Sequence, residues 1–123
     1  MSPTIAKRIT QAIATTTDNA LANSQYEFAP FDGTMEIGLQ ASAPLLQAAI
    51  FSGPDVLAEP GTPIPFPVGA TAAAPIEKMP VYPDDYHWED EVAHGDRLKI
   101  TVTNTNTAGG PHIVNVVLRL TPA

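Results

Sequence analysis

Two runs near the C-terminus alternate apolar and polar residues, and this period of two constrains the fold of the chain more than any other feature. The apolar positions are Leu98, Ile100 and Val102 in the first run and Val114, Val116, Leu118 and Leu120 in the second. Such alternation places the apolar side chains on one face of a strand. The intervening residues 104–111 include Gly109, Gly110 and Pro111 and suit a loop. The pattern predicts a β-hairpin with one face in a core.

Thirteen prolines among 123 residues argue against a helical bundle, because proline breaks helices and is confined to loops and to the edges or starts of strands. Turn signals at Asp32-Gly33 and at residues 52–55 separate further apolar runs. We predict one domain, residues 1–123, with about eight strands near residues 5–15, 25–29, 34–41, 45–51, 55–58, 86–92, 97–104 and 112–121. This all-β pattern is typical of an antiparallel β-sandwich, and it fits a jelly roll slightly better than an immunoglobulin-type sheet pair.

The N-terminal residues 1–24 allow two interpretations. Ser2 and Pro3 resemble the start of a helix, and Ile5, Ile9 and Ile13 would share one helical face. The β-branched residues, including the run of threonines at 15–17, favour a strand instead. We favour a strand or an extended N-terminal arm, followed by a turn around Asp18-Asn19.

The Pro-rich segment, residues 59–83, contains seven of the prolines. We expect no regular strand pairing there, because each proline removes a backbone donor. Ile64, Phe66 and Val68 alternate with prolines, so this part is expected to lie extended and to place its apolar side chains in grooves. Two readings stay open with equal weight: an ordered connection within one subunit, and an arm that contacts a neighbour.

The charge of the chain limits its partners. A net charge of −7 with only six Lys and Arg disfavours nucleic acid and anionic membranes, which bind through basic side chains. The absence of cysteine excludes disulfides and cysteine-bound metals. No apolar window approaches the ~18 residues of a membrane span, and no basic start precedes a long apolar run. We expect a soluble protein without a classical export signal.

Residues 84–96 concentrate six of the thirteen acidic side chains. The same segment holds two histidines and two aromatic residues, Tyr86, His87, Trp88 and His94. We interpret it mainly as a solvated acidic rim, with Tyr86 and Trp88 as candidate contacts to a partner or a sugar. A calcium site is a weaker alternative, because the spacing matches no EF-hand loop. A zinc or iron site at His87, Glu89 and His94 is weaker still.

Signatures of catalysis are missing from the sequence. It has no nucleophile elbow, no phosphate-binding glycine loop and no dinucleotide fingerprint. His112, beside Gly110 and Pro111, is expected to lie on the surface or to anchor a loop. We therefore predict that the protein is not an enzyme and has no catalytic residue, cofactor or metal. A small hydrolase or metal enzyme would require His87, His94 and a carboxylate to converge in one pocket.

A resemblance to a known class of proteins rests on three stretches taken together. These are GTMEIGLQASAPLLQAAIFSGPDVLAE, then HWEDEVAHGDRLKITVTNTNT after the Pro-rich crossing, and finally HIVNVVLRLTP. In this order the chain resembles the small jelly-roll decoration, cement and head-spike proteins of tailed phages and of phage-derived particles such as gene transfer agents. The turn Gly95-Asp96 entering the strand at Leu98 carries most of the likeness, which covers roughly the last two thirds of the chain.

The resemblance implies a virion structural protein that binds the outside of a capsid. Such proteins are commonly symmetric trimers or pentamers, so it implies a homo-oligomer, a major capsid or other particle protein as partner, and a place on the particle surface after synthesis in the host cytoplasm. We name Ile64 and Phe66, with Ile5, as candidate subunit contacts. The alternative is a carbohydrate-binding or adhesin module, which predicts Tyr86 and Trp88 on one flat platform, with calcium as a conceivable support.

Overall fold

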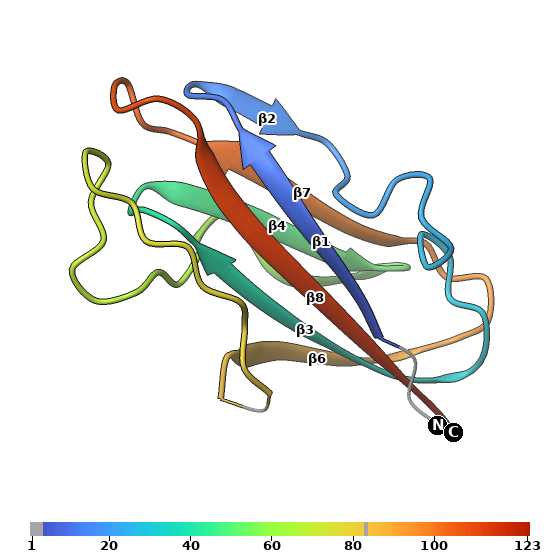
Figure 1. The fold of residues 1–123 in the computed structure, drawn as a ribbon. Helices are drawn as coiled ribbons and strands as arrows, with labels where there is room; N and C mark the ends of the chain where they lie inside the picture. The colour runs from blue at the N-terminus through green and yellow to red at the C-terminus, as the bar shows by residue number, and fades with distance from the viewer. Residues whose placement is uncertain (1–3, 83) are drawn as a thin grey trace.

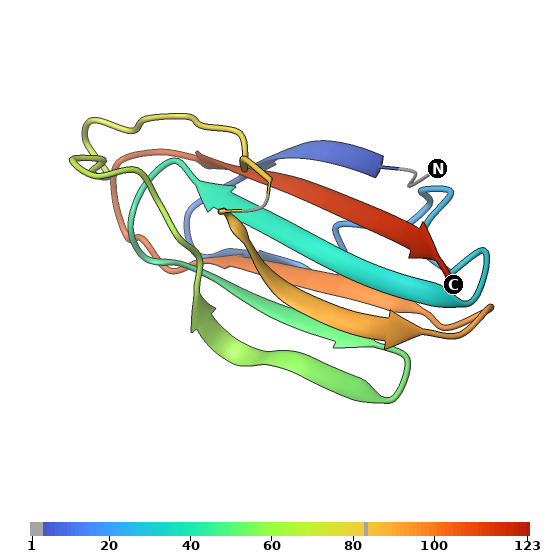
Figure 2. The ribbon, with the colours of Figure 1, turned by 90° about the horizontal axis from the view of Figure 1, so that it is seen from below.

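The computed structural model describes residues 4–82 and 84–123, which form two four-stranded antiparallel sheets packed face to face (Figures 1 and 2). The strands are β1 (Thr4–Gln11), β2 (Thr15–Thr17), β3 (Gly33–Ala41), β4 (Leu46–Ser52), β5 (Asp55–Pro63), β6 (Tyr86–Val92), β7 (Leu98–Asn104) and β8 (His112–Pro122). These described ranges contain no helix, and hence none that could span a membrane. The predicted all-β, antiparallel sandwich is confirmed at this level.

Pairing is antiparallel throughout. Sheet A has the strand order β1-β8-β3-β6 and sheet B the order β2-β7-β4-β5. The first strand therefore pairs with the last, the second with the seventh, the third with the sixth and the fourth with the fifth. β8 also pairs with β3, and β7 with β4, so these four strands form the centre of the two sheets.

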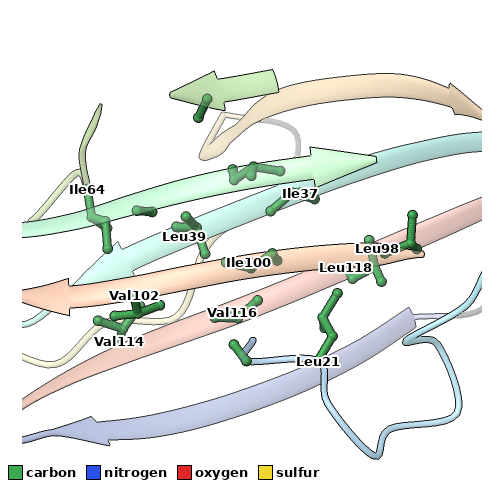
Figure 3. Close-up of a cluster of buried hydrophobic side chains, with 14 of the residues drawn as sticks. Leu21, Ile37, Leu39, Ile64, Leu98, Ile100, Val102, Val114, Val116 and Leu118 are labelled. Atoms are coloured by element: carbon green, nitrogen blue, oxygen red, sulfur yellow. The ribbon is translucent and has the colours of Figure 1, made fainter. Parts of the chain in front are cut away.

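The core lies between the sheets, and the alternation in the sequence accounts for it. Three side chains of β8 and three of β7 face each other across the interior (Figure 3): Val114, Val116 and Leu118, and Leu98, Ile100 and Val102. All of these side chains are at most 1% exposed. Burying these side chains removes apolar surface from water, which stabilises the fold by about 25 cal/mol for each Å² buried. The two predicted strands form, but the predicted hairpin is wrong: β7 and β8 do not pair with each other and lie at the centres of different sheets, each with its apolar face inward.

From Thr4 onward the N-terminal segment forms strands that belong to the sandwich, and the alternative helix start at Ser2 and Pro3 lies outside the described residues. β1 pairs along its whole length with β8 in sheet A, and β2 pairs with β7 in sheet B. The single strand predicted at 5–15 is wrong in one respect, because the chain changes sheets between Gln11 and Thr15. Ala14 has a φ of 56° in this turn, and the Thr15 hydroxyl donates to the Ala12 carbonyl at 2.6 Å.

The strand predicted at 25–29 is not formed. Only an isolated bridge joins Phe28 to Arg97. The backbone around it bonds irregularly to residues 96–98, with Leu98 N donating to Glu27 O at 2.7 Å. The short alternation of Tyr26 and Phe28 was too brief to fix a strand, and Pro30 follows at once.

The Pro-rich segment begins with more regular structure than the sequence predicted. β5 continues through Pro60 to Pro63 and pairs with β4, with register shifts between Ala48 and Phe51. The prediction that no ladder survives there is therefore wrong for residues 59–63. β5 lies at the edge of sheet B, where a proline can leave its missing donor on the unpaired side.

Candidate interaction surface

The crossing segment, residues 64–82, connects β5 in sheet B to β6 in sheet A and passes around one end of the sandwich (Figures 1 and 2). At its start Ile64 N donates to Leu46 O at 2.9 Å, and Pro65 O accepts from Ala41 N at 2.8 Å. Further along, Ile76 N donates to Ser42 O at 2.9 Å. The segment has no regular secondary structure, but hydrogen bonds fix its path.

Beyond Ile76 the crossing segment lies against the outer face of sheet A. The Glu77 carboxylate accepts two hydrogen bonds from the Arg8 guanidinium of β1, at 2.9 and 3.0 Å. Asn115 of β8 donates to the Lys78 carbonyl at 3.0 Å. The bonds from Arg8, with a weaker contribution from Asn115, hold the pKa of Glu77 below its usual value. Asn115 is 1% exposed because the segment covers it.

A glycine in β3 makes room for the end of the crossing segment. A Cβ atom on Gly38 would lie 2.8 Å from Cβ of Pro80 and 2.9 Å from the Tyr86 ring. Pro80 is consequently buried against the sheet. Next to it, the Arg119 guanidinium lies 4.6 Å from the Tyr82 ring centroid and bonds to Glu36 at 2.9 Å. Both ends of the segment are therefore packed onto the sandwich.

Apolar side chains are nevertheless exposed along the crossing segment. Six of the nine large hydrophobic side chains that are exposed among the described residues lie here: Phe66, Val68, Ile76, Met79, Val81 and Tyr82. Val68 is fully exposed. Exposed apolar side chains that are concentrated in one region mark interaction sites more often than scattered ones do. This anchored apolar surface is the best candidate for a functional site in the described chain.

The candidate contact residues predicted from the sequence differ in how far the structure exposes them. Phe66 is 43% exposed on the crossing segment and is available to a partner. Ile64 is 2% exposed and belongs to the core (Figure 3), so its predicted subunit contact is corrected: it packs inside its own subunit. Ile5 is partly buried against the same core. The sequence did not mark Met79 or Tyr82, since nothing in their pattern distinguishes an exposed from a covered position.

Tyr86 and Trp88 point to opposite faces of β6. Tyr86 lies over Gly38 on the outer face, with its ring edge-on to Tyr82 at 4.9 Å between centroids. Burial raises the pKa of the Tyr86 hydroxyl. Trp88 lies opposite Ile37 and packs against the core. The flat aromatic platform expected of a sugar-binding module is therefore not made by this pair.

The acidic segment does not assemble a metal centre among the residues described. No group of three His, Asp or Glu side chains within 4–82 and 84–123 is placed to hold a metal ion. His94 lies in the loop after β6, where its backbone N–H donates to Asp32 at 2.8 Å. The convergence of His87, His94 and a carboxylate that a metal enzyme would require is not found in this part of the structure.

Two open depressions of about 260 and 250 Å³ indent the surface. The first lies at the ends of β3 and β6, beside Asp32 and Glu91. The second is lined by Phe51, Gly53, Arg97 and Lys99. Arg97 pairs with Glu27 and Lys99 with Asp18, at 3.3 and 3.2 Å, so both cations of the second depression already have carboxylate partners.

Comparison with models of protein families, with curated proteins and with solved structures finds no match to this chain. Inference about function therefore rests on the arrangement of its own residues.

One pair of carboxylates is held close together at the start of β5. A hydrogen bond from protonated Asp55 to Asp90 of β6, together with repulsion between the two carboxylates, raises the pKa of Asp55. Asp96 adds a weaker repulsion. The Oδ2 atom of Asp90 is buried and has no hydrogen-bond partner among the described residues.

We expect Asp55→Asn to raise the melting temperature at pH 7. A raised folded-state pKa means that ionised Asp55 opposes folding, so the penalty is present above that pKa and disappears as the pH falls to the ordinary Asp value of about 3.9. The gain should therefore shrink between neutral pH and about pH 4. Thermal melts across this range measure it, with Glu59→Gln on the same strand as control. Equal gains at pH 7 and pH 3.5 would contradict the explanation.

Proposed function

We propose that this chain is a virion structural protein with a jelly-roll fold, which binds the outside of a capsid and self-assembles symmetrically. The fold proposal is supported by the strand pairing: β1 with β8, β2 with β7, β3 with β6 and β4 with β5. A jelly roll has this order, because its chain forms one long antiparallel hairpin that wraps into two sheets. Eight strands in two sheets is the jelly-roll composition, and jelly rolls occur in viral capsid and lectin domains.

The observation that carries the functional proposal is the apolar crossing segment. Its prolines limit the freedom of the unbound chain, and its bonds to Arg8, Ser42 and Asn115 hold it in place before any partner arrives. A preformed surface loses less conformational entropy on binding than a flexible one. Phe66, Val68 and Met79 would then be buried against the particle.

Charge supports the same proposal. A net charge of −7 on a surface protein would make decorated particles repel each other and stay dispersed. The affinity of one copy for the particle would come from apolar area, and several copies held in one oligomer would add avidity.

The test is binding to particles that lack the protein. Particles from cells in which the gene is deleted, purified on a density gradient, are mixed with the wild-type chain and sedimented. We expect wild-type protein to co-sediment, and Phe66→Asp with Val68→Asp to reduce the bound amount about tenfold or more, because truncation of apolar anchors removes most of the binding energy. The melting temperature should be unchanged, since both side chains are exposed.

Val56→Asp is the matched control, because Val56 is 54% exposed but lies on β5 in sheet B. It should bind like the wild type. Failure of the wild-type chain to sediment with any such particle would overturn the capsid-binding function. Equal loss in Val56→Asp and in the Phe66/Val68 variant would overturn the role of the crossing segment.

A further inference from the structure

The two edges of sheet A carry opposite charge. β1 forms one edge and contains Lys7 and Arg8, while β6 forms the other and contains Glu89, Asp90 and Glu91. No other described strand forms a backbone ladder with the free side of either one. An unpaired edge presents a row of backbone donors and acceptors that can pair with another chain.

Strand direction permits the two edges to join. Each step across sheet A, from β1 to β8 to β3 to β6, is antiparallel. β1 and β6 therefore run in opposite directions. A second copy related by rotation about an axis along the strands would place its β1 antiparallel to β6 of the first, so the sheet would continue across the boundary without reversing either subunit.

One register matches both faces of the two edge strands. On β1, Lys7 lies opposite Val116 and so points inward, and on β6, Asp90 lies opposite Met35 and also points inward. Setting Lys7 against Asp90 gives matched cross-strand partners from Ile5 to Ile9 of β1. The inward pairs are Ile5 with Val92, Lys7 with Asp90 and Ile9 with Trp88, and the outward pairs include Ala6 with Glu91 and Arg8 with Glu89.

Other registers lose this match. A slip of one residue turns each inward side chain of one strand against an outward side chain of the other. A slip of two puts Lys7 against Trp88 or Val92 and leaves the charges unmatched. Opposite charges and apolar pairs set directly across from each other stabilise paired strands, at about 0.2–1 kcal/mol for each pair.

Lys7 and Asp90 are also charged residues that form no ion pair within the described part of the subunit. The chain has six Lys and Arg, and the five other than Lys7 form ion pairs: Arg8, Lys78, Arg97, Lys99 and Arg119. Lys7 forms none with the described residues. Asp90 forms no ion pair there either: its carboxyl group lies beside that of Asp55 of β5, and its buried Oδ2 atom lacks a donor. A buried carboxylate oxygen without a donor is costly, and an ammonium group from outside would satisfy it.

We infer that copies of this chain associate head to tail through sheet A, with β1 of one subunit pairing with β6 of the next and Lys7 of one meeting Asp90 of the other. The inference rests on the self-assembly proposed above and names its interface. An inward-pointing charge on an edge strand prevents that edge from pairing with a strand that does not neutralise the charge. Here Lys7 opposes pairing of β1 with another β1, and Asp90 opposes pairing of β6 with another β6, so only the unlike edges fit. Successive head-to-tail contacts close into a ring if the rotation permits.

Charge reversal tests the pair in the full-length chain. We expect the wild type to form an oligomer of uniform mass by light scattering on a sizing column, and Lys7→Glu or Asp90→Lys to weaken association about tenfold or more, because each places like charges opposite each other. The double variant, Lys7→Glu with Asp90→Lys, should regain the oligomer. Lys99→Glu, with the same change of charge on sheet B, should behave like the wild type. Melting curves establish that each variant is folded.

The register has its own test, because the chain contains no cysteine. Ala6→Cys with Glu91→Cys should oxidise to disulfide-linked multimers, and Ala6→Cys with Glu89→Cys, displaced by two residues, should do so much less. A bond within one subunit is excluded, because β1 and β6 are three strand spacings apart, about 14 Å, and a disulfide needs Cα atoms within about 7 Å.

The outcomes separate this inference from the proposed function. An oligomer that survives both single reversals, or disulfides that form equally in both cysteine pairs, would overturn the β1–β6 interface and leave self-assembly standing. A wild-type monomer at every concentration would overturn the interface and self-assembly together. Binding of the chain to particles is a separate measurement, so capsid attachment can hold or fail independently of either result.

Discussion

Replacing Leu118 by alanine is expected to lower the free energy of unfolding by about 3 kcal/mol, because a fully buried leucine leaves a cavity that the sandwich cannot close. Leu118 is 0% exposed. It lies opposite Ile5 on one side and Ile37 on the other, in the strand that joins β1 to β3. A shift of either neighbouring strand into the cavity would break backbone hydrogen bonds, so little relaxation is available.

Urea unfolding of the wild type and Leu118→Ala measures this loss, and the melting temperature should fall by roughly 10 °C. Leu45→Ala is the control, because it removes the same atoms from a side chain that is 61% exposed. Its effect should be below about 0.5 kcal/mol. A loss under 1 kcal/mol for Leu118→Ala would mean that the two sheets are not packed as tightly as described.

The second large effect is expected at Asn19, whose side chain forms hydrogen bonds with the backbone of β7, as a neighbouring strand would. Its Oδ1 atom accepts hydrogen bonds from the backbone N–H groups of Leu21 and Ile100, at 3.0 and 3.2 Å. Its Nδ2 group donates to the Leu98 carbonyl at 3.3 Å. Asn19→Ala would leave these buried backbone groups unpaired, at a cost of about 2–3 kcal/mol.

Urea unfolding measures the cost of Asn19→Ala, and hydrogen exchange locates it, because the amides of Leu21 and Ile100 should exchange faster than those of β8. Gln25→Ala, at an exposed position of the same loop, should change neither the free energy of unfolding nor the exchange rates of these amides. Unchanged protection at Ile100 would show that another group takes over the role of Asn19.

Much of the fold could be predicted from the sequence, because burial on one face imposes a period of two. The runs at Leu98–Asn104 and His112–Pro122 have this period, and both are strands with inward apolar faces. The number of strands was right, but the assignment was not. The predicted strand at 5–15 is two strands in different sheets, and the one at 25–29 is absent. Local pattern does not record which sheet a strand joins.

The site was less predictable than the fold. Phe66 and Ile64 have the same local pattern, alternating with prolines, yet one is exposed and the other is in the core. Tyr86 and Trp88, two residues apart, should share a face on a regular strand. A register shift between Ile37 and Gly38 places them on opposite faces instead. Such shifts depend on the partner strand, so the spacing within one strand cannot reveal them.

The all-β class, the main buried strands and the acidic character of the surface follow from the amino-acid sequence, because periodicity, proline content and charge act through each residue alone or through near neighbours. Which residues contact each other depends on the three-dimensional fold. It brought Arg8 to Glu77, Asn19 to Ile100 and Asp55 to Asp90, and it put Lys7 and Asp90 on opposite edges of one sheet. Contacts between residues far apart in the chain depend on the order and register of strands, which are set by the packing of the whole sandwich.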